Sequence, residues 1–247
     1  MIKVTGLNKA FGALRAVHDL SFEAMPRRIT SIIGPNGAGK STAFNLIAGT
    51  LRPDSGGVEL DGQDVTGKPS YKLARLGVAR SFQITNLFFG LSVLENVRLA
   101  CQSRERRARY LVRLDRLADP MARAAEILEE CGIDDNAGEL VGNLSHGDQR
   151  RVEIAVSVAL EPKVLMLDEP TQGMSPAETS EVDALIKSLA SRVTVLLIEH
   201  DIDLVMSISD HVIVMHQGRK LFEGVPSAVR ASREVQDAYL GADHAAA

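Results

Sequence analysis

Short apolar runs alternate with helical patterns along this chain. Three runs of mostly β-branched and aliphatic residues, 29–33, 163–167 and 193–198, are typical of strands buried on both faces of a parallel sheet. The segment 177–190, between the last two runs, has helical spacing, as the crossover of a βαβ unit requires. A second helix is expected over 42–48, after the first run. These patterns predict an α/β fold whose core is a mostly parallel sheet.

The N-terminal part of the chain has a different pattern. Up to about residue 60 it alternates like strands joined by turns, with a turn cluster at 52–57 and a strand that resumes at 58–60. We therefore expect an antiparallel β subdomain before the helical part of the chain.

The middle of the chain, roughly 90–160, is rich in Ala, Leu, Arg and Glu, and 121–131 has apolar residues at helical spacing. This predicts a helical subdomain inserted into the α/β core of a single domain, 1–247. Near the C-terminus, 211–222 has the pattern of a hairpin and 241–247 that of a short tail. The middle segment also carries a group of basic residues, which we interpret as a solvated face: Arg104, Arg106, Arg107, Arg109, Arg113 and Arg116.

Composition narrows the possible functions. The chain has 247 residues, 45% of them hydrophobic and 24% charged, and a net charge of −4, so no general affinity for nucleic acid or anionic lipid is expected. Its longest apolar run, around 193–198, is far shorter than the ~20 residues that span a bilayer. Any membrane association should therefore come from a protein partner. Cys101 and Cys131 form no CxxC pair, which favours two reduced thiols.

Residues 34–41 have the spacing of a phosphate-binding P-loop, with a strand before them and a helix after. Glycines let successive backbone N–H groups face one anion, and the helix N-terminus adds partial positive charge. Lys40 would supply a charge for the β- and γ-phosphates, and Ser41 a hydroxyl for Mg²⁺. A plain glycine-rich turn is the alternative, which the strand–loop–helix context disfavours. The expected nucleotide-binding positions here are Gly34, Pro35, Asn36, Gly37, Ala38, Gly39, Lys40, Ser41 and Thr42.

Two further strands end in polar residues. The run 163–167 is followed by Asp168 and Glu169, at the sheet edge where ligands bind in open α/β folds. Asp168 suits Mg²⁺, and Glu169 could orient or deprotonate a water. His200 follows the run 193–198, from where it could contact the terminal phosphate. An acidic turn and a structural histidine are the alternatives, and the P-loop favours the catalytic interpretation.

Residues 144–148, Leu-Ser-His-Gly-Asp, resemble the signature stretch of the ABC ATPase family, usually Leu-Ser-Gly-Gly-Gln. The resemblance covers nearly the whole chain. Gln83 matches the family's Q-loop, Phe11 the aromatic that stacks on adenine, and His200 the switch histidine, while 173–176 occupies the D-loop position. The signature separates this family from other P-loop enzymes.

The resemblance implies a nucleotide site shared between two chains, in which Ser145 and Gly147 of one subunit complete the P-loop site of the other. ATP and Mg²⁺ are the implied cofactors, and the implied reaction is ATP hydrolysis. The implied metal-binding set is Ser41, Gln83 and Asp168. The implied catalytic set is Glu169, His200, Lys40 and Gln83. The sequence departs from the family at His146 and Asp148 in the signature and at Pro176 in the D-loop, and keeps the catalytic set.

Within the family, the stretches 80–83, 86–96, 198–206 and 238–241 resemble the larger ATPase subunit of importers for branched-chain amino acids and related amides or urea. The implied partners are a second ATPase subunit (an identical chain or a paralogue), transmembrane permease subunits and, indirectly, a solute-binding protein, with no nucleic acid. The implied location is peripheral, at the cytoplasmic face of the membrane. An exporter or lipopolysaccharide-extraction ATPase is the alternative, and a soluble non-transport ABC ATPase a further one.

Overall fold

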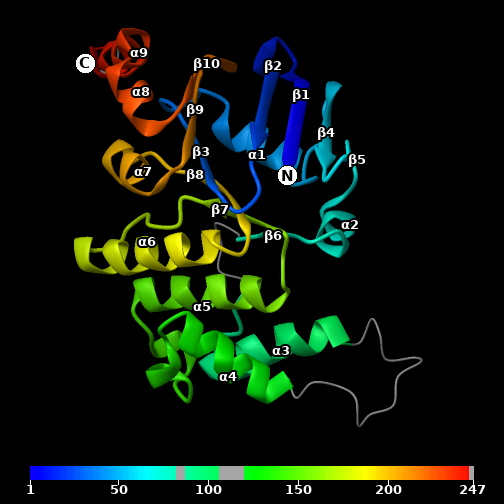
Figure 1. Cartoon of the computed structure of the whole chain (residues 1–247), viewed down its shortest axis with the longest axis vertical. Coiled ribbons are helices and arrows are strands. Elements are labelled where there is room, and N and C mark those ends of the chain that lie inside the picture. The colour runs from blue at the N-terminus through cyan, green and yellow to red at the C-terminus, as the bar shows by residue number, and fades with distance from the viewer. Residues whose placement is uncertain (82–86, 106–119, 245–247) are drawn as a thin grey trace.

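The computed structural model describes residues 1–81, 87–105 and 120–244 (Figure 1). The expectation for Gln83 falls outside these residues. So do those for five of the six arginines of the middle segment, Arg106, Arg107, Arg109, Arg113 and Arg116.

The core sheet has six strands, and five of them run parallel, as the apolar runs predict. Its central strands are buried at every position, because helices cover both faces. The sixth strand pairs antiparallel at one edge, as the second arm of the predicted hairpin. The spatial order is β10 (Arg219–Gly224), β9 (His211–His216), β3 (Ile29–Ile33), β8 (Thr194–Ile198), β7 (Val164–Asp168) and β6 (Val78–Arg80).

The second sheet is antiparallel and confirms the expected N-terminal β subdomain. Its order is β2 (Leu14–Ala24), β1 (Ile2–Phe11), β4 (Ser55–Leu60) and β5 (Gln63–Asp64).

The prediction of a turn over 52–57 is wrong in its second half, because β4 begins at Ser55. The pairing of β1 with β4 is irregular here, and a Cβ on Gly56 would lie 2.1 Å from the carbonyl oxygen of Gly6. The two glycines at 56 and 57 therefore permit a close strand crossing, which composition alone does not distinguish from a turn.

Helix α1 (Lys40–Ile47) begins two residues before the expected start and packs its apolar face between the two sheets. Helices α6 (Pro176–Ala190) and α4 (Pro120–Glu130) lie within one residue of their predicted limits. The other helices are α2 (Ser70–Arg75), α3 (Val93–Glu105), α5 (His146–Ala159), α7 (Ile202–Ile208), α8 (Pro226–Ala231) and α9 (Arg233–His244), with short 3₁₀ turns at Asp134–Asn136 and Val141–Asn143.

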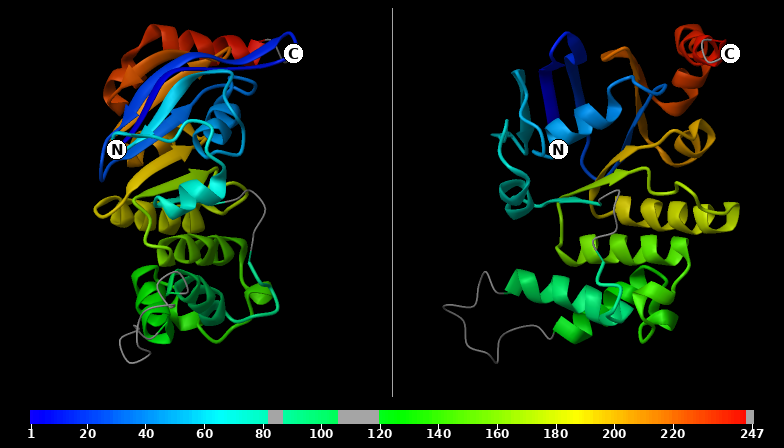
Figure 2. Two further views of the ribbon diagram at one scale, coloured as in Figure 1. Left: turned by 90° about the vertical axis from the view of Figure 1, so that its right-hand side faces the viewer. Right: turned by 180° about the vertical axis from the view of Figure 1, so that it is seen from behind.

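Helix α5 lies between α6 and the pair α3 and α4, at the end of the molecule away from the antiparallel sheet (Figures 1 and 2). These three helices fall within the segment expected to form the helical subdomain. At the C-terminus, α9 runs to His244, so the tail expected over 241–247 is helical in its first four residues.

Candidate functional site

The P-loop connects β3 to α1, and two of its glycines are required by the chain's own backbone. A Cβ on Gly34 would lie 2.1 Å from the carbonyl oxygen of Met215, and one on Gly39 would lie 2.2 Å from that of Ala16. Gly39 also has φ of 97° as the N-cap of α1, a left-handed conformation that favours glycine. The loop is thereby pressed against β2 and β9, with Lys40, Ser41 and Thr42 in the first turn of the helix.

Lys40 is 7% exposed, and its Nζ donates hydrogen bonds to the carbonyl oxygens of Gly34 (2.6 Å) and Pro35 (3.2 Å). Burial lowers the pKa of Lys40, while the nearby charges of Glu169 and Asp168 act in the opposite direction. The N-terminus of α1 has no side-chain cap and no acidic residue in its first turn. An anion such as phosphate fits here, because the helix dipole and the ammonium group face no carboxylate of the same turn.

Asp168 ends β7 and is 2% exposed. Its Oδ2 accepts a hydrogen bond from Nη2 of Arg80 at 3.1 Å, whereas its Oδ1 is buried with no hydrogen-bond partner among the described residues. A buried carboxylate oxygen without a donor fits a Mg²⁺ ligand, directly or through a water. Arg80 also donates to Asn45 Oδ1 (2.6 Å) and Thr50 Oγ1 (3.1 Å), which ties the end of β6 to α1.

Glu169 and His200 leave the ends of the adjacent strands β7 and β8. Glu169 has φ of 45°, and its N–H donates to the carbonyl of Ile198 at 2.9 Å, which turns the chain out of the sheet. Its Oε2 lies 4.0 Å from Nδ1 of His200, whose side chain is 55% exposed. The structure therefore brings together two of the predicted catalytic residues, and the pKa of Lys40 responds to Glu169 as well.

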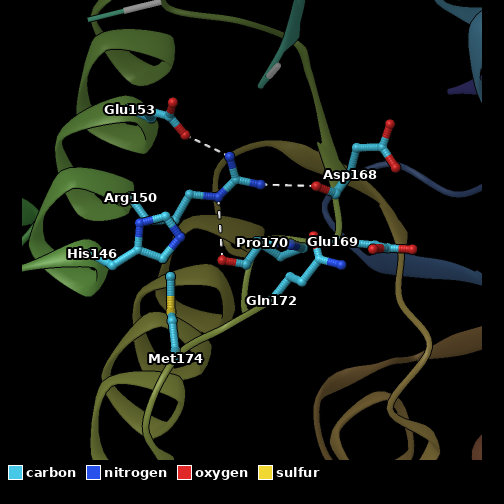
Figure 3. A pocket seen from close by; sticks show the side chains of 8 residues that line it. All are labelled: His146, Arg150, Glu153, Asp168, Glu169, Pro170, Gln172 and Met174. Carbon is cyan, nitrogen blue, oxygen red and sulfur yellow. Dashed lines mark hydrogen bonds and ion pairs between the residues drawn. The ribbon is translucent and has the colours of Figure 1, made fainter. Parts of the chain in front are cut away.

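Arg150 of helix α5 holds the backbone on both sides of Glu169 (Figure 3). Its guanidinium donates to the carbonyl oxygens of Asp168 (2.9 Å) and Pro170 (3.2 Å) and pairs with Glu153, one turn further along α5. Burial raises the pKa of Glu153, with Arg150 opposing that shift. The left-handed turn at Glu169 is thus fixed from the signature helix, because a buried arginine donates to its flanking carbonyls.

A small pocket lies between this arginine and the turn, with His146 and Met174 at its rim (Figure 3). His146, which departs from the family pattern, thus faces the D-loop of its own chain. The other signature departure, Asp148, pairs with Arg151.

The signature residues lie at the N-terminus of α5. Ser145 is the N-cap, and its Oγ accepts the N–H of Asp148 at 3.1 Å. The N–H of Gly147 donates to Oε1 of Glu178 at 3.2 Å, and a Cβ on Gly147 would lie 2.8 Å from Cγ of Glu178. Glu178 also accepts from Ser175 of the D-loop, and these bonds lower its pKa to about 2. No hydrogen bond or ion pair among the described residues joins Ser145 or Gly147 to the P-loop.

Phe11, at the end of β1, is 48% exposed and has Nζ of Lys9 5.6 Å from its ring centre. Sequence reasoning missed the roles of Arg80, Arg150 and Glu178. Arg80 belongs to a stretch that carries the family resemblance, and Arg150 directly follows the signature, so proximity to the motifs was their one signal.

The ABC transporter family matches residues 17–172, and a second family, the branched-chain amino acid ATP-binding cassette transporter, matches residues 219–245. The chain is 42% identical over 250 residues to the high-affinity branched-chain amino acid transport ATP-binding protein BraF of Pseudomonas aeruginosa, and 41% identical over 249 residues to LivG of Escherichia coli. Each comparison covers 98% of this chain and 98% of the relative.

Solved structures agree with these relatives. The ADP conformation of an ATP-binding cassette of an ABC transporter is 29% identical with a TM-score of 0.86, over 98% of both chains. A dimeric cassette in a post-hydrolysis state, bound to ADP and Pi, is 26% identical with a TM-score of 0.76, over 92% of this chain and 99% of the other. No helix among the described residues is long and apolar enough to cross a bilayer. The chain belongs to the ABC transporter family, in which it is an ATP-binding and ATP-hydrolysing subunit.

Proposed function

We propose that this chain powers an importer for branched-chain amino acids or related small solutes, from the cytoplasmic face of the membrane. The observation that carries the proposal is the match of residues 219–245, which span β10, α8 and most of α9, to the branched-chain amino acid cassette family. That segment lies outside the part of the chain matched by the general ABC transporter family, so it adds information on the subfamily.

Within the site, the P-loop and Lys40 hold the phosphates, and Phe11 stacks on adenine. Ser41, Asp168 and Gln83 would hold Mg²⁺ or its waters, and the ion would offset phosphate charge. Glu169 orients the attacking water, and His200 contacts the γ-phosphate. A second subunit, identical or paralogous, supplies Ser145 and Gly147, so that closing the pair excludes bulk water.

The proposed contact with the permease subunits is an apolar patch beside α3. Phe88 is 60% exposed, Phe89 44%, Leu91 36% and Leu140 46%. Backbone hydrogen bonds hold these residues together, from Val141 N to Leu91 O (3.1 Å) and from Gly142 N to Phe89 O (3.2 Å). Several large apolar side chains on one surface are typical of a protein interface.

Transport by a reconstituted complex tests the proposal. The chain is co-expressed with its permease subunits, its paralogous ATPase and its solute-binding protein, and placed in liposomes. We expect ATP-dependent uptake of labelled leucine or a related solute that unlabelled isoleucine or valine reduces. Export, or stimulation of the ATPase by lipopolysaccharide instead, would support the alternative transport class and contradict import.

The patch is tested separately. Phe88→Ser should prevent co-purification with the permease while the isolated chain keeps its ATPase rate. Met25→Ser, which removes a similarly exposed apolar side chain (49%) at the other end of the core, is the control and should leave assembly unchanged. Normal assembly of the Phe88 variant would contradict the proposed docking surface.

A further inference from the structure

Glu199 is a fully buried carboxylate directly before His200. It is 0% exposed and follows the last residue of β8. Burying an ionised carboxylate is costly unless donors surround it, so its hydrogen-bond partners indicate what it is there to hold.

Its two oxygens contact the two segments that carry the catalytic residues. Oε1 accepts from the backbone N–H (3.2 Å) and the hydroxyl (2.8 Å) of Thr171, two residues after Glu169. Oε2 accepts from the backbone N–H of His200 at 3.2 Å. The strands β7 and β8 are paired in register up to Asp168 and Ile198, so Glu199 continues their connection beyond the sheet, where no ladder hydrogen bonds remain.

The ring of His200 faces the same carboxylate. Its Nδ1 lies 3.5 Å from Oε2 of Glu199 and 4.0 Å from Oε2 of Glu169. An acceptor beside Nδ1 favours a proton on that nitrogen and fixes the orientation of the ring, as carboxylates do for histidines in other active sites. Nε2 is then the nitrogen left for the nucleotide.

The geometry points to Glu199 as a positioning residue for ATP hydrolysis. It holds the Thr171 turn and the His200 ring in one arrangement, so that Glu169 and His200 keep their spacing when nucleotide enters. This inference rests on the proposed contact of His200 with the γ-phosphate. A carboxylate that only stabilised the fold would affect melting temperature but neither the histidine ring nor the split between binding and turnover.

The test compares Glu199→Gln with a matched control in the full chain. Gln keeps the shape and one oxygen for Thr171, but it places an amide donor where His200 needs an acceptor. Glu223→Gln is the control, because Glu223 forms the same kind of pair with His211 (3.0 Å) on the outer hairpin. ATP affinity is measured by calorimetry, turnover by phosphate release, and the histidine rings by ¹⁵N NMR, with His200→Ala to assign the signal among six histidines.

We expect Glu199→Gln to lower kcat at least about 10-fold, with ATP affinity within twofold of the wild type and shifted His200 ring nitrogen signals. Glu223→Gln should change neither kcat nor the His200 signals. A kcat within twofold of the wild type, or lost turnover with unchanged His200 signals, would overturn the inference. If Glu199→Gln does not fold, Thr171→Val replaces it, and a wild-type rate in that variant overturns the link. Normal turnover by His200→Ala would instead overturn the proposed role of His200 itself.

Discussion

The two halves of the nucleotide site are both built at helix N-termini, yet they differ in what faces the positive end. At α1, Lys40 donates to loop carbonyls, and no acidic side chain lies in the first turn. At α5, Ser145 caps the helix, and the N–H of Gly147 is bonded to Glu178 of the same chain. The P-loop half is therefore ready for an anion, whereas the signature half already holds one.

This difference separates binding from closure. One chain alone can bind ATP through the P-loop, because nothing in that half has to be displaced. The signature half must exchange the carboxylate of Glu178 for the phosphate of the partner's ATP before the two chains close. The following variants test that distinction in order of expected effect.

Lys40→Ala should have the largest effect on the open half. Removing the ammonium group from a partly desolvated phosphate site is expected to weaken ATP binding at least about 100-fold, or roughly 3 kcal/mol. Calorimetry with ATP measures the loss. Lys163→Ala is the control, because Lys163 is 64% exposed and pairs with Asp61 away from the P-loop. Undiminished binding in the Lys40 variant would contradict the P-loop assignment.

Glu169→Gln should separate binding from chemistry. We expect ATP affinity within twofold of the wild type and a kcat lower by about 10²–10⁴, since the amide cannot act as a general base. Phosphate release under saturating ATP provides the measurement, and Glu129→Gln on the exposed face of α4 is the control. A near-normal rate would exclude Glu169 as the group that activates water.

Glu178→Gln should make the signature half easier to close. In the Glu169→Gln background, which holds ATP, the ATP concentration that gives half-maximal dimer should fall about three- to tenfold, because a neutral amide competes less with phosphate for the signature N–H. Light scattering after gel filtration measures the dimer. Since the pKa of Glu178 is lowered to about 2, its charge is lost only as pH falls toward that value, and the effect should be constant between pH 6 and 8.

Glu181→Gln serves as the control for this variant, because it alters an exposed carboxylate one turn further along α6. An unchanged or higher ATP requirement in the Glu178 variant would show that its carboxylate does not oppose closure.

Gly147→Ala tests whether the glycine is required within one chain. Its Cβ would lie 2.8 to 2.9 Å from Glu178, so we expect a loss of about 1 kcal/mol in the monomer's free energy of unfolding, even without ATP. Glu178→Ala should remove most of that loss in the double variant, as a double-mutant cycle in urea would show. Strictly additive effects would mean that the two residues do not constrain each other.

The parts of the site that sequence could predict are local patterns. Asp168 and Glu169 end a buried apolar run, and the P-loop is one contiguous stretch, so neighbouring residues are enough to identify them. The residues that hold them are not local: Arg80 contacts Asp168 from 88 residues away, and Glu178 contacts Gly147 from 31. Such pairs depend on how β6, α5 and α6 pack against the sheet edge, which no spacing rule encodes. The same holds for Glu199 and Thr171, 28 residues apart.

The smallest effect is expected at Asp183 of α6, whose Oδ1 is buried without a hydrogen-bond partner. Burial raises its pKa to about 6, with Glu199 and Asp201 adding to the shift and Lys187 opposing it. A raised pKa stabilises the fold when the group is protonated, so this contribution is complete below about pH 4 and is lost as pH rises through 6. Asp183→Asn should therefore add roughly 1 kcal/mol to the free energy of unfolding at pH 7.5 and almost nothing near pH 4. Urea titrations at pH 4.5, 6 and 7.5, with the exposed Asp237→Asn as the control, measure the trend. A gain that does not change with pH would show that the charge of Asp183 is not what the folded chain resists.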